Sequence, residues 1–137
     1  MKVRAVFSGS RRTWGSQSRG RTVFLEPVVD LRPVDGTPDV DGVVHYPSRT
    51  TVVDFVGSVR PAHPGSSVRV RVFKYAGDGS AVRLVSMNRI LDRSSAFDLA
   101  FAVPAPGTGL YKAVARFSSD GDHATARSAR VLFMVDP

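Results

Sequence analysis

The amino-acid sequence predicts an all-β protein whose main body is an antiparallel sandwich. Segments with apolar residues at every second position recur along the second half of the chain, at a spacing of about 8–15 residues. The 12 glycines and 9 prolines of the 137-residue chain include clusters between these segments, where they favour turns. No segment repeats apolar residues with helical spacing over a helical length. These observations together favour an antiparallel sandwich or barrel.

The N-terminal part, residues 1–49, is predicted to lie outside the sandwich. Val3–Phe7 and Arg21–Leu25 are short strand candidates, and the Gly-, Ser- and Arg-rich stretch between them favours a loop. This pattern predicts either a hairpin with a long basic loop or an extended arm. Four prolines then punctuate residues 26–48 and disfavour both helix and central strand. We therefore expect an extended connector there, with at most a short strand at Val43–Tyr46.

Residues 50–137 are predicted to form the sandwich itself. The expected strands are Thr51–Arg60, Ser67–Tyr75, Val82–Met87, Ala96–Val103, Leu110–Phe117 and Arg127–Val135. In the second of these, three valines alternate with Arg69 and Arg71, so the valines face the core and the arginines face outward. Lys112 and Arg116 alternate in the same way with the apolar residues of the fifth strand. Asn88–Ser94 and Ser118–Ala126 are expected to be turns or loops.

A resemblance to a known family rests on four segments of the predicted sandwich. These are Val56–Pro61, Val68–Val72, Ser95–Leu99 and Pro106–Arg116. They resemble immunoglobulin-like, or fibronectin-III-like, modules of bacterial surface proteins and phage virions. Tyr111 follows the turn into the penultimate strand and is similar to a tyrosine corner, which implies that its hydroxyl bonds to the corner backbone. Ala113 stands where antibody-type domains have a disulfide cysteine, and the chain has no cysteine.

The formal net charge of +7 is distributed unevenly along the chain. Residues 1–25 carry six basic residues and no acidic one, whereas residues 26–41 carry five acidic residues and one arginine. Residues 42–137 carry twelve basic and seven acidic residues. Such asymmetry is typical of an interaction arm, here followed by an acidic strip. The alternative is a solvated tail that neutralises itself against that strip.

The basic head supplies the candidate partner-binding residues. They are Arg4, Arg11, Arg12, Trp14, Arg19 and Arg21. Guanidinium groups pair with carboxylates or phosphates, and an indole ring can stack on a nucleic-acid base. One aromatic residue does not make a stacking platform. We therefore expect other protein chains as partners, with nucleic acid as the less favoured alternative.

The sequence predicts no enzyme, cofactor or metal site. It contains neither a Gly-x-Ser-x-Gly elbow nor a phosphate-binding P-loop. The expected strand order would gather loop residues at one end of the sandwich: His63, Asp92, Asp120, Asp122 and His123. Such a group could hold a metal or ligand. The favoured interpretation is that the Asp-Gly-Asp sequence only forms a tight turn.

The expected function follows from the resemblance and the arm. No apolar run approaches the ~20 residues that cross a bilayer, and the first residues lack the apolar core of a secretory signal. Virion modules of the resembled family imply a non-enzymatic phage head-decoration or tail protein. Its basic arm would dock on capsid or tail subunits, and its module would project outward in an oligomeric assembly. The alternatives are an extracellular adhesion or carbohydrate-binding module and a small nucleic-acid-binding protein.

Overall fold

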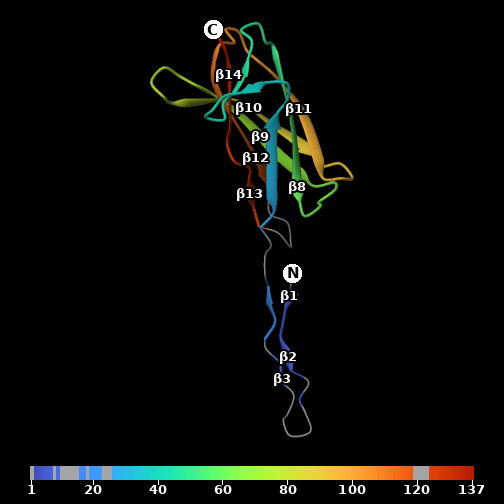
Figure 1. Ribbon diagram of the computed structural model, residues 1–137. Coiled ribbons are helices and arrows are strands. Elements are labelled where there is room, and N and C mark those ends of the chain that lie inside the picture. Colours follow the sequence, from blue (N-terminus) through green and yellow to red (C-terminus); the bar gives the residue numbers. More distant parts are fainter. Residues whose placement is uncertain (1, 8, 10–15, 18, 23–25, 119–123) are drawn as a thin grey trace.

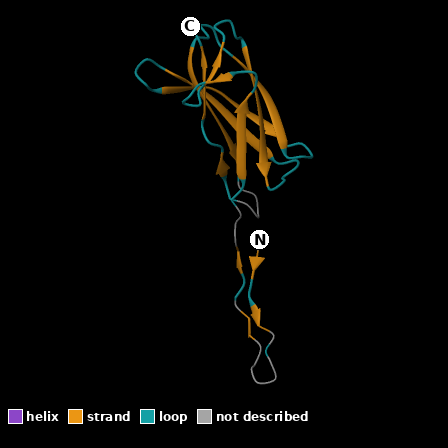
Figure 2. Ribbon diagram, in the orientation of Figure 1, coloured by secondary structure: helices purple, strands orange, loops and turns teal. Residues whose placement is uncertain are grey.

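The computed structural model describes residues 2–7, 9, 16–17, 19–22, 26–118 and 124–137. Within these residues the regular elements are all strands, which confirms the predicted all-β class (Figure 2). The described residues contain no helix long and apolar enough to cross a membrane.

Two sheets form the body of the protein (Figure 1). The large sheet has the order β10 (Ala81–Ile90), β9 (Ser67–Tyr75), β12 (Gly109–Phe117), β14 (Val131–Val135), β7 (Val44–Tyr46) and β6 (Thr37–Pro38), and β13 (Ala126–Arg127) also pairs with β12. The small sheet has the order β11 (Ala96–Ala102), β8 (Val52–Arg60) and β5 (Val28–Pro33). Every pairing is antiparallel except that of β14 with β7, which is parallel. The predicted antiparallel sandwich therefore contains one parallel pairing. After β5 the chain crosses from the small sheet to the large sheet. There β7 lies beside β14 and runs in the same direction.

Alternating side chains build the core between the two sheets. Val68, Val70 and Val72 of β9 are fully buried, as their period of two predicts. The inward residues of β11 and β12, from Phe97 to Phe101 and from Tyr111 to Phe117, are also buried. Phe133 of β14 lies at the centre of an aromatic cluster. Its ring stacks on that of Tyr111 with centroids 5.0 Å apart, and it meets the rings of Tyr46, Phe55 and Phe101 edge-on.

The Tyr111 side chain closes the corner that precedes β12. Its ring is buried, and its hydroxyl donates a hydrogen bond of 2.6 Å to the carbonyl of Gly107. This is the bond to the corner backbone that the sequence led us to expect. It ties a proline- and glycine-rich turn to the core without a disulfide.

The proposed connector is wrong for residues 28–33, because β5 is a strand of the small sheet. It pairs with β8 from Val28↔Arg60 to Pro33↔Phe55, and it buries Val29 and Leu31 in the core. β5 pairs with β8 alone and so forms an edge of its sheet, where proline is tolerated. Two of the four prolines that argued against a strand lie at its ends: Pro27 precedes β5, and Pro33 is its last residue. The expected short strand near residue 44 exists as β7. Strand pairing of β5, β6 and β7 therefore makes most of residues 28–46 part of the two sheets.

Two further boundaries differ from those predicted. β10 continues to Ile90, although Asn88–Ser94 was expected to be a turn. β10 is an edge strand with mostly exposed side chains, so its polar composition resembles that of a loop. The last strand begins at Val131, and Ala126–Arg127 forms a separate short strand on β12.

The N-terminal segment forms a hairpin that extends beyond one end of the sandwich (Figure 1). β1 (Lys2–Val3) pairs with β4 (Arg21–Thr22), and β2 (Val6–Phe7) pairs with β3 (Ser16–Gln17). Of the two expectations, hairpin and extended arm, the structure has the hairpin. We call the described part of residues 2–22 the basic hairpin.

Candidate interaction surfaces

The basic hairpin carries three of the six residues predicted to bind a partner: Arg4, Arg19 and Arg21. Arg4 and Arg19 are exposed. Arg21 lies in β4 opposite Val3, and Arg11, Arg12 and Trp14 lie outside the described residues. Val3 and Val6 of the hairpin are also exposed, by 50% and 60%. The hairpin thus offers both cationic and apolar contacts to a partner.

Asp92 and His63 are the described members of the group that could have formed a metal or ligand site at one end of the sandwich. Both make contacts that stabilise the fold. Asp92 accepts hydrogen bonds through one carboxylate oxygen from the backbone of Ser94 and Ala96 and from the Ser94 hydroxyl. The bond from Ala96 and those from Ser94 lower the pKa of Asp92. The His63 ring packs on Phe117, with ring centroids 4.9 Å apart. Asp120, Asp122 and His123 lie outside the described residues. In the described part of the chain, no group of three or more His, Asp or Glu side chains is arranged so that it could hold a metal ion.

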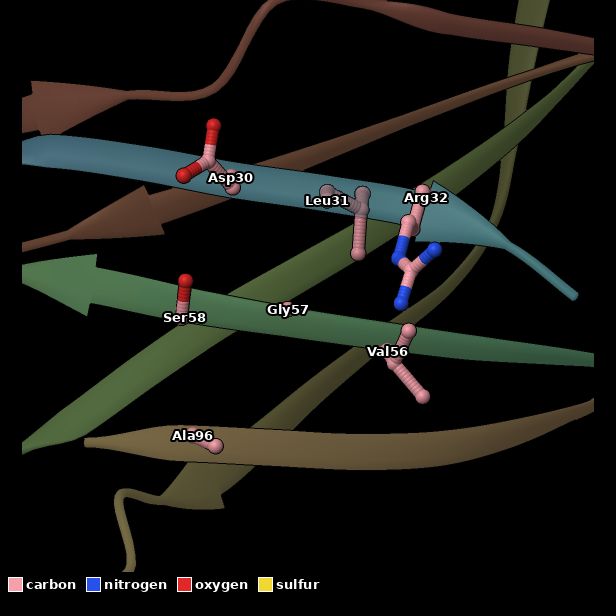
Figure 3. A pocket seen from close by; sticks show the side chains of 7 residues that line it. All are labelled: Asp30, Leu31, Arg32, Val56, Gly57, Ser58 and Ala96. Carbon is pink, nitrogen blue, oxygen red and sulfur yellow. The ribbon is translucent and has the colours of Figure 1, made fainter. Parts of the chain in front are cut away.

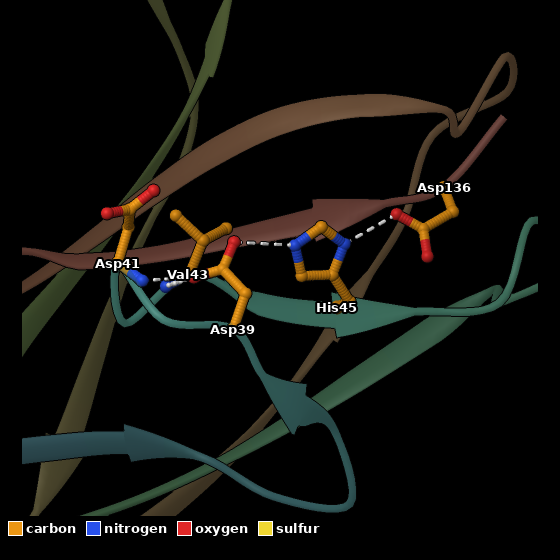
Figure 4. A network of polar contacts seen from close by, with 5 residues as sticks. All are labelled: Asp39, Asp41, Val43, His45 and Asp136. Carbon is orange, nitrogen blue, oxygen red and sulfur yellow. Dashed lines mark hydrogen bonds and ion pairs between the residues drawn. The ribbon is translucent and has the colours of Figure 1, made fainter.

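An acid–histidine–acid contact joins the C-terminal end to the β6–β7 turn (Figure 4). His45 Nδ1 lies 2.7 Å from a carboxylate oxygen of Asp136, and its Nε2 lies 3.0 Å from one of Asp39. These two hydrogen bonds raise the pKa of His45, and the contact with Asp136 contributes most. The carboxylates sit at opposite ring nitrogens, so the imidazole separates them. The arrangement fastens two chain segments together and leaves no common point where all three groups could ligate one ion.

The outer face of the small sheet has a shallow hollow of about 490 Å³ beside Gly57 (Figure 3). It exists because Ser58 and Ala96 present little side-chain bulk between β5 and β11. A carboxylate oxygen of Asp30 at its rim is 3.1 Å from an Arg60 nitrogen, so this acid is already paired. In Figure 3 the Asp30 and Arg32 side chains extend from β5 at the edge of the hollow, whereas the Val56 side chain extends from β8.

The outer face of the large sheet gathers basic side chains from three strands. They surround a groove of about 180 Å³ that we call the basic groove, lined by Arg69, Arg71, Phe73, Lys112, Val114, Arg116 and Arg127. The sequence placed Arg69 and Arg71, and separately Lys112 and Arg116, on outward strand faces. It did not predict that β9 and β12 are neighbours, which brings these residues together.

Comparison with known proteins does not assign a function to any of these surfaces. No protein-family model matches the sequence, and no curated protein matches it.

Proposed function

We propose that this protein is a non-enzymatic structural protein in which an immunoglobulin-like module is anchored to a larger assembly by the basic hairpin. Two features support the immunoglobulin-like assignment. β5, β8 and β11 form one sheet while β9, β12 and β14 belong to the other, and the Tyr111 hydroxyl bonds to the turn before its strand. Both are features of that fold.

The observation that carries the anchoring proposal is the composition and exposure of the hairpin. Its strands pair with each other as two-stranded ladders, and Val3 and Val6 are exposed, as are Arg4 and Arg19. An isolated two-stranded hairpin is marginally stable in water, so a partner surface that covers these valines would stabilise it. Arginine favours an acidic partner, because its planar guanidinium pairs with carboxylates in a bidentate manner. A capsid or tail subunit of a phage fits this description, and we propose the virion as the protein's location.

The structure of the described titratable clusters supports a non-enzymatic role. Asp92 caps a turn, and His45 is held between two carboxylates at a junction of chain segments. A carbohydrate-binding role is less well supported, because sugar stacking requires accessible aromatic faces. Phe73 and Tyr75 are half-buried, and the Lys112 ammonium group lies 4.6 Å and 5.9 Å from their ring centroids.

The anchoring proposal is tested by removing charge from residues 1–25, which include the basic hairpin, in the full-length chain. We expect a variant with Arg4, Arg11, Arg12 and Arg19 changed to Gln to be lost from assemblies purified by density gradient from cells that express the neighbouring genes. A control variant replaces four exposed arginines of the sandwich: Arg49, Arg83, Arg93 and Arg130. It removes the same net charge and should remain in the assemblies. Equal retention of both variants would contradict anchoring by the hairpin.

A further inference from the structure

The basic groove contains a row of three arginines that crosses three adjacent strands. Arg116 of β12 is the direct Cα partner of Arg69 in β9 on one side and of Arg127 in β13 on the other. Neighbouring strands lie about 4.8 Å apart, so the row concentrates three cationic side chains within roughly 10 Å of backbone. Arg71 and Lys112, on the same outward faces of β9 and β12, complete a set of five cations around the groove.

These cations have no carboxylate partners among the described residues. The ion pairs there join His45 with Asp39 and Asp136, and Arg60 with Asp30. Arg69 donates to the neutral amide of Asn88, at 3.2 Å. The Nε atoms of Arg71 and Arg116 are buried, and no described residue supplies them with a hydrogen-bond acceptor.

Such an arrangement is unfavourable for the isolated sandwich. Like charges on directly paired residues destabilise a sheet, and a buried donor without an acceptor loses its hydration. A ligand with several anionic oxygens reverses both effects, because it neutralises the row and accepts hydrogen bonds from the guanidinium groups. The groove therefore has the properties of a polyanion site.

The side chains favour phosphate groups on a nucleic-acid backbone. Four of the five cations are arginines, whose guanidinium groups bind phosphate oxygens in a bidentate manner. Base stacking is disfavoured, because Lys112 lies over the ring of Phe73, the aromatic residue that lines the groove. We propose that the basic groove binds the phosphodiester backbone of nucleic acid without reading its sequence. This proposal is independent of the anchoring role of the hairpin.

The test is a titration of the full-length chain with fluorescently labelled duplex DNA of random sequence, repeated from about 50 to 200 mM salt. Each lost phosphate contact reduces the slope of log affinity against log salt by about 1. We expect the variant Arg71→Gln/Arg116→Gln to bind more weakly and to lower that slope by about 2. A second variant, Arg69→Gln/Arg127→Gln, changes exposed residues of the same groove and should have a similar effect. Circular dichroism establishes that each variant is folded.

The control variant Arg32→Gln/Arg49→Gln removes two exposed arginines that do not line the groove. This control should retain most of its affinity for DNA and most of the slope of log affinity against log salt, because the groove is intact. An equal loss in the control would overturn the proposal in favour of a nonspecific effect of net charge. Displacement of DNA by polyglutamate as readily as by unlabelled DNA would overturn it in favour of an acidic protein partner. Failure of the unmodified protein to bind DNA at about 50 mM salt would also overturn it.

Discussion

The substitution Leu31→Ala tests whether β5 belongs to the core. The Leu31 side chain is 9% exposed, and it lies on the strand that the prolines had suggested was a connector. The substitution removes three carbon groups at about 0.8 kcal/mol each, or about 2.4 kcal/mol for complete burial. A residual cavity raises the expected loss to about 3 kcal/mol. Val28 on the same strand is 52% exposed, so Val28→Ala should cost less than about 1 kcal/mol.

Urea unfolding followed by far-ultraviolet circular dichroism measures both free energies of unfolding. The only tryptophan, Trp14, belongs to the N-terminal segment, so its fluorescence is a poor probe of the sandwich. We expect Leu31→Ala to lower the urea concentration at the unfolding midpoint strongly and Val28→Ala to lower it only slightly. The dependence of the unfolding free energy on urea concentration should be unchanged in Leu31→Ala. A loss below about 0.5 kcal/mol for Leu31→Ala is typical of surface positions and would refute the placement of β5 in the core.

Three other predictions concern the corner, the close packing at Gly57 within the small sheet, and the histidine contact. Tyr111→Phe removes the donor to the Gly107 carbonyl and should reduce the free energy of unfolding by about 1–2 kcal/mol; an unchanged thermal midpoint would show that this bond does not stabilise the corner. Gly57→Ala would direct a Cβ atom into the Phe97 ring and the Asp30 carbonyl, so it should cost about 1–3 kcal/mol, whereas Gly77→Ala meets no atom within 4 Å and should be nearly neutral; similar midpoints for the two variants would contradict the predicted overlap. The pKa of His45 is raised above its unfolded value of about 6.5, so its contribution to stability is complete below that pH and is lost as the pH rises through the raised pKa. The thermal midpoint of the unmodified protein, relative to that of His45→Gln, should therefore fall as the pH rises above about 6.5 and through the raised pKa; a constant difference between the two proteins would exclude this linkage.

The fold was predictable where side-chain alternation is strict. β9, β11 and β12 lie close to their expected limits, because β-branched and aromatic residues alternate with polar ones and Gly/Pro turns bound them. β5 and the end of β10 were harder to identify because these two edge strands lack the strict apolar–polar alternation bounded by turns that β11 shows: β5 is bounded by prolines, and β10 is largely polar. An edge strand tolerates proline in the one case and polar side chains in the other, so its local sequence resembles a connector or a loop.

The candidate surfaces were predictable only where they are local in sequence. The basic hairpin appears as a run of arginines without acidic residues, and a single segment shows it. The basic groove depends on which strands are neighbours, since Arg69 and Arg116 are 47 positions apart yet are direct partners. The contact between His45 and Asp136 is likewise non-local, because 91 positions separate the two residues. Alternation indicates which face a residue occupies, but strand order decides which residues meet there.

Site-specific photo-crosslinking tests the central claim that the basic hairpin anchors the module to an assembly. A crosslinking amino acid is placed at Arg4 or Arg19 in the hairpin, or at the exposed Arg83 of β10 as a sandwich control. Irradiation of purified assemblies should join the hairpin positions to one and the same protein of the assembly and leave the control position largely unreacted. Crosslinks from Arg83 alone, or none from either hairpin position, would contradict the claim.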